Sequence, residues 1–132
     1  MRVLVLGATG NLGSRVLSAL IQNEHSVFAF VRNASKLVPG VRGRLSGLEE
    51  GDARNAADIK SAVTRNRCDA IVNTAGLAAM APWGKSDLPT IVDAVICAAL
   101  EIGSERGSPL RLWVLAGQSL LDVPTTKYRI VD

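Results

Sequence analysis

Three glycines near the start of the chain are spaced for holding a diphosphate. Gly7, Gly10 and Gly13 stand three residues apart, after the apolar run 3–6 and before an amphipathic stretch. In a strand-to-helix turn, the first glycine permits a tight turn, the second leaves room for a pyrophosphate, and the third lets the helix pack closely. The unpaired N–H groups and the positive dipole at the helix start would attract that group. A glycine turn that binds nothing is the alternative, and the flanking strand and helix favour a dinucleotide.

The residue after the next predicted strand bears on which dinucleotide binds. Residues 26–31 form an apolar run that predicts a buried strand, and Arg32 follows it, nineteen residues after Gly13. An acid here would bind the ribose hydroxyls of NAD, whereas an arginine accommodates the 2′-phosphate of NADP. Lys36 is close enough in sequence to reach the same phosphate. Two solvated surface cations are the alternative, and the position of Arg32 together with the missing acid favours NADP(H) as the cofactor.

The positive charge of the chain is concentrated in one window. The formal net charge is +3, and a stretch without any acidic residue holds Arg32, Lys36, Arg42 and Arg44. Nucleic acid is one class of partner for such a patch, but no nucleic-acid motif or interleaved aromatic residues accompany it. We therefore expect a small phosphorylated ligand and a small-molecule substrate, and no nucleic-acid partner.

Length and composition point to one ordinary globular domain. The 132 residues are 48% apolar and 20% charged, which allows one core and not two. No apolar run is long enough to span a bilayer and no signal peptide is visible, so we expect no membrane association and a cytoplasmic location. Cys68 and Cys97 are too few for a disulfide framework and are predicted to be buried free thiols. His25 has no partner ligand, so no metal site is expected.

Apolar runs and amphipathic stretches alternate along the chain. This alternation predicts an α/β fold, a doubly wound parallel sheet of five strands in the order 3-2-1-4-5. Residues 38–47, which are rich in glycine and proline, and residues 77–87 are expected to be loops. The expected strands are 3–6, 26–31, one within 44–50, 69–76 and 110–116, and the expected helices are 11–23, 55–65 and 89–101.

Single residues set the expected limits of these elements. Gly47 is predicted to interrupt the third strand, and Gly103 to stop the last helix. Asp52 lies at the edge of an adenine ring or caps the helix that follows, and capping is the favoured interpretation. Only Asp93 is charged within residues 91–100, so the last helix is apolar nearly all round. Such a helix is expected to pack on the sheet and also against a later segment of a longer chain or a second copy, as in a homo-oligomer.

Four segments carry a resemblance to a known family. They are the glycine turn 7–13, the strand end 31–37, the pair 51–52 and the strand exit 116–120. In these segments the chain resembles the atypical short-chain dehydrogenases/reductases, and more narrowly the NAD(P)H-binding subgroup of NmrA-like proteins, flavin reductases and the biliverdin-IXβ reductase type. Members of the family continue well beyond the fifth strand. The resemblance therefore implies one NAD(P)-binding Rossmann domain over 1–132, without the family's C-terminal substrate-covering part.

The resemblance also implies roles for individual residues. The glycine turn would hold the pyrophosphate, Arg32 with Lys36 the 2′-phosphate, and residues 52–53 the adenine. Residues 74–76 and 116–117 would lie along the ribose and nicotinamide. Ser119 matches the family serine beside the hydride-transfer site and is the candidate catalytic residue. The expected cofactor-binding residues are Gly7, Thr9, Gly10, Asn11, Leu12, Gly13, Arg32, Lys36, Asp52, Ala53, Thr74, Ala75, Gly76, Ala116 and Gly117.

One departure from the family bears on the chemistry. The Tyr-x-x-x-Lys pair of standard members is not present, since the single tyrosine, Tyr128, is followed four residues later by Asp132. Without that phenol a carbonyl substrate has no evident general acid, whereas an electron-poor ring accepts hydride without one. The sequence therefore predicts an NADPH-dependent oxidoreductase acting on a flavin, quinone or similar conjugated acceptor. A non-catalytic NADP-binding sensor of the NmrA-like type and a non-redox enzyme on the same fold are the alternatives.

Overall fold

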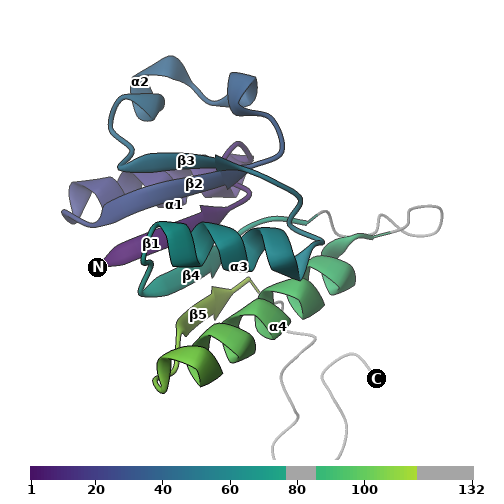
Figure 1. Ribbon diagram of the computed structural model, residues 1–132. Coiled ribbons are helices and arrows are strands. Elements are labelled where there is room, and N and C mark those ends of the chain that lie inside the picture. The colour runs from purple at the N-terminus through teal and green to yellow at the C-terminus, as the bar shows by residue number, and fades with distance from the viewer. Residues whose placement is uncertain (77–85, 116–132) are drawn as a thin grey trace, which may run out of the picture.

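Five parallel strands form the sheet at the centre of the protein. They are hydrogen-bonded in the order β3-β2-β1-β4-β5, which confirms the predicted topology. Because all five run the same way, their carboxyl ends lie along one edge of the sheet (Figure 1). The computed structural model describes residues 1–76 and 86–115, and its strands are β1 (Arg2–Leu6), β2 (Ser26–Val31), β3 (Gly47–Glu50), β4 (Ala70–Asn73) and β5 (Arg111–Val114).

Helices cover both faces of the sheet, as Figure 1 shows. Helix α1 (Asn11–Gln22) lies on one face, and α3 (Ala56–Arg65) and α4 (Leu88–Arg106) lie together on the other. Successive side chains of a strand point to opposite faces, so a continuous apolar run fills both cores. The buried side chains divide accordingly, Val3, Val5, Val27, Ala29 and Val31 toward α1 and Leu4, Leu6, Phe28, Phe30 and Ile71 toward α3 and α4.

The segment between β2 and β3 is more ordered than its composition predicts. It contains a short 3₁₀ helix, η1 (Ala34–Lys36), and one turn of α-helix, α2 (Pro39–Arg42). The expectation of loop over 38–47 was wrong at α2, because proline in the first turn of a helix favours helical backbone rather than breaking it.

Gly47 begins β3 and does not interrupt it, contrary to the prediction. It pairs with Phe28 of β2 across the sheet. A Cβ on Gly47 would lie 2.7 Å from Cδ1 of Phe28, so the missing side chain leaves room for the aromatic ring. The glycine that seemed to weaken the strand is therefore what lets the two strands pair over a buried ring.

Helix α4 continues past the glycine that was expected to stop it. Gly103 is an interior residue of α4, and the helix ends after Arg106 at Gly107, whose φ of 67° is left-handed. Glycine adopts this conformation without strain, which is why it commonly follows the last helical residue. The rule that a glycine ends a helix therefore holds, but the glycine concerned is Gly107 and not Gly103, so the helix is longer than expected.

The outer side of α4 is exposed and partly apolar. Ile96 is 41% exposed and Leu100 is 69% exposed. Cys97 is also exposed, and its Sγ lies 3.6 Å from Oε1 of Glu101. The prediction that both cysteines are buried was therefore wrong for Cys97 and is confirmed for Cys68. Burial raises the pKa of the Cys68 thiol to about 11. Within the described ranges, no helix is both long and apolar enough to cross a bilayer.

Candidate functional site

The glycine turn between β1 and α1 has the geometry that its spacing predicts. Gly7 has a φ of 77°, and a Cβ there would lie 2.6 Å from the Ala75 nitrogen. The Gly10 N–H donates to the Gly7 carbonyl oxygen at 3.0 Å, which closes the turn. A Cβ on Gly13 would lie 2.0 Å from that same oxygen, so only glycine lets α1 begin this close to the turn.

The amino end of α1 is open to an anionic ligand. Its N-cap is Gly10, no side chain caps the first turn, and that turn contains no acidic residue. Thr9, Asn11 and Leu12 around it are exposed. The first N–H groups of a helix have no partner within the helix, and the helix dipole makes this end partially positive. The arrangement therefore supplies the donors that a diphosphate needs.

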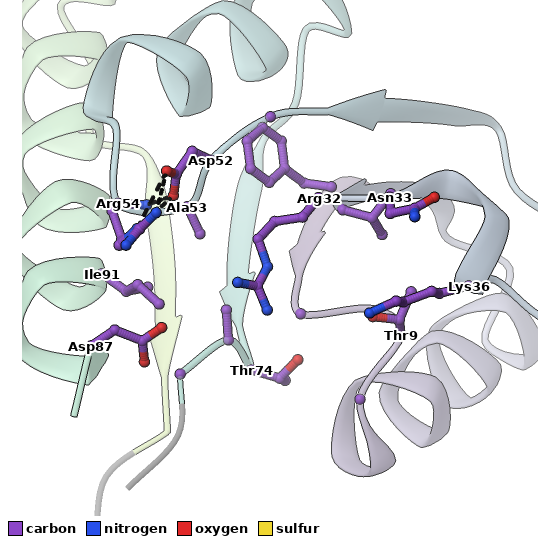
Figure 2. Close-up of a pocket in the computed structure, with 17 residues that line it drawn as sticks. Thr9, Arg32, Asn33, Lys36, Asp52, Ala53, Arg54, Thr74, Asp87 and Ile91 are labelled. Atoms are coloured by element: carbon purple, nitrogen blue, oxygen red, sulfur yellow. Dashed lines mark hydrogen bonds and ion pairs between the residues drawn. The ribbon is translucent and has the colours of Figure 1, made fainter. Parts of the chain in front are cut away.

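A cleft of about 250 Å³ lies along the carboxyl edge of the sheet. It opens beside β1, where the strand order reverses, which is where ligands bind in open α/β sheets. Figure 2 shows its walls coming from the glycine turn, the ends of β2, β3 and β4, and the start of α4. The lining residues are Gly7, Thr9, Gly10, Phe30, Val31, Arg32, Asn33, Lys36, Gly51, Asp52, Ala53, Arg54, Thr74, Ala75, Gly76, Asp87 and Ile91.

Two cations reach into this cleft from the end of β2. The Arg32 guanidinium points into its centre, and Lys36 reaches toward Thr9 (Figure 2). Neither Arg32 nor Lys36 has an ion-pair partner in the part of the chain that the structure describes. Arg42 and Arg44 do not line the cleft. The basic window of the sequence therefore divides, and only its first half faces the candidate site.

Asp52 pairs with Arg54 at the other end of the cleft. The Arg54 backbone N–H donates to Asp52 Oδ1 at 2.9 Å, and Arg54 Nη2 donates to Asp52 Oδ2 at 2.9 Å. Hydrogen bonds from the Arg54 side chain and backbone lower the pKa of the Asp52 carboxyl. Asn55 caps α3 instead, with its Oδ1 accepting from the Ala57 N–H at 2.9 Å. The predicted capping role of Asp52 was therefore wrong, since Asn55 immediately precedes the helix.

The structure brings most of the predicted site residues to one place. Asn11 and Leu12 lie in the exposed first turn of α1, and Gly13 is buried beneath it. Ala116, Gly117 and Ser119 lie outside the described residues. The remaining ten line the cleft together: Gly7, Thr9, Gly10, Arg32, Lys36, Asp52, Ala53, Thr74, Ala75 and Gly76.

The other residues that line the cleft were not predicted as site residues, and they are Phe30, Val31, Asn33, Gly51, Arg54, Asp87 and Ile91. Arg54 could have been found, since it follows Asp52 just beyond the end of β3 and so lies at the same edge. Asn33 lies next to Arg32, but its side-chain oxygen accepts from Ser35 N and Oγ and so stabilises η1. Asp87 and Ile91 come from the start of α4, and no sequence pattern places that point beside the glycine turn.

These residues fit a dinucleotide phosphate rather than a metal ion. In residues 1–76 and 86–115, no group of three or more His, Cys, Asp or Glu side chains is placed to hold a metal. The cleft combines an uncapped helix start with two unpaired cations, which are groups that recognise phosphate. A Cβ on Gly10 would have a single neighbour within 4 Å, the Gly7 carbonyl oxygen at 3.3 Å. The rest of the space around the Gly10 backbone is therefore open to a ligand.

The fold and the glycine turn define an NAD(P)-binding Rossmann protein. A family model confirms this assignment, because the NAD dependent epimerase/dehydratase family matches residues 3–102. The chain belongs to that family. The expected relation to dehydrogenases and reductases of the short-chain type is thereby confirmed.

Individual relatives show the same relation. The chain is 33% identical over 108 residues to the uncharacterized sugar epimerase YhfK of Bacillus subtilis, covering 76% of this chain and 48% of that protein. It is 34% identical over 86 residues to a UDP-glucose 4-epimerase of Klebsiella pneumoniae, covering 61% of this chain and 62% of that protein.

A solved structure has the same fold at lower sequence identity. ChuY, an anaerobillin reductase from Escherichia coli O157:H7, is 20% identical with a TM-score of 0.67, over 92% of this chain and 53% of that one. The chain thus spans about half the length of ChuY and of YhfK.

Proposed function

We propose that residues 1–132 form the dinucleotide-binding domain of an NADPH-dependent oxidoreductase that reduces a flavin, quinone or similar conjugated acceptor. NADPH, when bound, supplies the hydride that such an acceptor takes up. One observation carries the proposal: Arg32 occupies the strand end where NAD-binding proteins have an acid, and it faces the same cleft as the glycine turn.

Each wall of the cleft has a role in this proposal. The amino end of α1 binds the diphosphate, and Arg32 with Lys36 binds the 2′-phosphate. Asp52 and Ala53 lie by the adenine, and residues 74–76 lie along the ribose and nicotinamide. Together they orient the dinucleotide across the edge of the sheet. Ser119 is the candidate catalytic residue, on the strength of the family resemblance alone.

Epimerisation of a sugar nucleotide is the second candidate function. It is supported by the two relatives, at 33% and 34% identity, whose names are sugar epimerases. Arg32 favours the reductase, because a guanidinium at this strand end accommodates the 2′-phosphate of NADPH, the hydride donor of the proposed reduction. The similar fold of an anaerobillin reductase is consistent with a conjugated acceptor.

The assay that tests the proposal combines the purified protein with NADPH and a panel of flavins and quinones. Loss of nicotinamide absorbance is followed against a blank without protein, and we expect turnover with at least one acceptor. Turnover with none of them, together with binding of both oxidised and reduced dinucleotide, would contradict the reductase and favour the NADP sensor. Interconversion of UDP-glucose and UDP-galactose without net loss of NADPH would favour the epimerase.

A further inference from the structure

We propose that Arg54 determines dinucleotide specificity by cancelling the charge of Asp52, so that the 2′-phosphate of NADP(H) can bind at Arg32. The inference rests on the proposed function, since it assumes that the cleft binds a phosphorylated dinucleotide. Arg54 acts through Asp52 in this account and is a specificity-determining residue, not a catalytic one.

The contacts between the two side chains account for both carboxylate oxygens. Arg54 Nε lies 3.1 Å from Asp52 Oδ1 and 3.3 Å from Oδ2, in addition to the backbone and Nη2 hydrogen bonds described above. A guanidinium held against a carboxylate in this way leaves the pair close to neutral. The side chains of Arg54 and Asp52 are 54% and 41% exposed, so the pair lies at the mouth of the cleft. An exposed ion pair contributes little to folding stability, so the main effect of this pair is on the electrostatic environment of a ligand in the cleft.

The position of Asp52 explains why its charge would matter. It follows β3, which pairs with β2 through Val31 and Glu50, so Asp52 and Arg32 leave neighbouring strands at the same edge. Figure 2 shows Arg32 between the Asp52–Arg54 pair and Lys36. Arg32 and Asp52 line the same cleft. The hydrogen bonds from Arg54 are the main cause of the lowered pKa of Asp52, and the charge of Arg32 adds a smaller contribution. An uncancelled carboxylate here would compete for Arg32 and repel a phosphate bound to it.

Other charges around the cleft do not replace Arg54 in this role. Lys36 lies on the far side of Arg32 from Asp52, and Asp87 at the start of α4 adds a second carboxylate near Arg54. The described cleft therefore has two carboxylates on the Arg54 side and two cations on the other. Arg54 is the cation that is hydrogen-bonded to the Asp52 carboxylate and so offsets its charge.

A set of four proteins separates the charge of the pair from its structure. The pair is negative in Arg54→Gln, neutral in the wild type, positive in Asp52→Asn, and neutral again in the double variant. We expect the ratio of the NADH to the NADPH dissociation constant to fall about threefold to tenfold in Arg54→Gln and to rise by a similar factor in Asp52→Asn. The double variant should return the ratio to near the wild-type value. These changes should shrink with added salt.

Controls identify what each result means. Arg42→Gln removes the same charge from α2, outside the cleft, and should leave the ratio unchanged. Equal weakening of NADPH and NADH in Arg54→Gln, without restoration in the double variant, would overturn the inference and assign Arg54 to the adenine or the backbone turn. Failure of the wild type to bind either dinucleotide would overturn this inference and the proposed function together. NADPH binding without reduction of any acceptor would contradict only the reductase, and the ratios would still decide the role of Arg54.

Discussion

We propose that one side chain at the end of β2, Arg32, discriminates between the closely related cofactors NADP and NAD. NADP differs from NAD by a phosphate that carries between one and two negative charges near neutral pH. A guanidinium can donate two parallel hydrogen bonds to such a group, whereas a carboxylate repels it. Arg32 meets this requirement because it points into the cleft and has no ion-pair partner among the described residues.

Reversing the charge at this position tests the assignment directly. Arg32→Glu should weaken NADPH binding by about 30-fold to 1000-fold, since it removes charge-assisted hydrogen bonds and adds repulsion. NADH should lose far less affinity, because it has no group at this position. Titration of each dinucleotide by calorimetry measures both losses. Arg44→Glu makes the same change of charge outside the cleft, and equal losses of NADPH and NADH affinity in Arg32→Glu would show that Arg32 does not recognise the 2′-phosphate.

The sequence identified best those site residues whose type determines the local backbone conformation. The tight turn at Gly7 and the close packing of Gly13 both require the absence of a side chain. The glycine spacing, with an apolar run before it and an amphipathic stretch after it, therefore predicted them. The pairing of Asp52 with Arg54 was missed, because both residues also have ordinary roles near a helix start. Asn55 competes for the cap position, and in the folded protein Asn55 is the residue that caps α3.

At the scale of elements, two glycines near the carboxyl end of α4 should respond in opposite ways to substitution, Gly103 inside the helix and Gly107 directly after it. Gly107 has a left-handed φ of 67°, where a side chain is strained, whereas a Cβ on Gly103 would have its nearest neighbour at 3.5 Å. We expect Gly107→Ala to lower the free energy of unfolding by about 1 kcal/mol. Gly103→Ala should raise it by up to about 1 kcal/mol, because alanine favours helix in an interior position.

Urea denaturation of the two alanine variants measures this difference against the wild type. The variants control for each other, since each adds one methyl group near the carboxyl end of α4, one inside the helix and one directly after it. A destabilising Gly103→Ala together with a neutral Gly107→Ala would mean that α4 ends at Gly103, as the sequence had suggested.

Most other element limits were predicted within two or three residues, because continuous apolar runs and caps are local properties. The end of α4 was not, since it depends on which glycine adopts the left-handed conformation.

At the scale of the whole molecule, the cleft exists only in the assembled sheet. Its walls come from residues as far apart in sequence as Gly7 and Ile91, and they meet because β1, β2, β3 and β4 end at one edge. The strand order was predictable from the alternation of elements, and it placed the glycine turn beside the ends of β2 and β4. The approach of α4 to this edge was not predictable, because it depends on how α4 packs against α3 and the sheet.

A ligand bound across several strands must stabilise the fold as a unit. At a concentration one hundred times its Kd, NADPH should add about 2.7 kcal/mol to the free energy of unfolding. For a domain of this size, that increment raises Tm by about 10 °C. Thermal unfolding with NADPH, NADH or neither measures the effect, and at equal concentrations NADPH should raise Tm more than NADH. Arg32→Glu should remove that excess while Arg44→Glu keeps it. Identical Tm values with and without NADPH would mean that NADPH does not bind to the folded chain at that concentration, because a ligand that binds only the native state must shift its unfolding equilibrium.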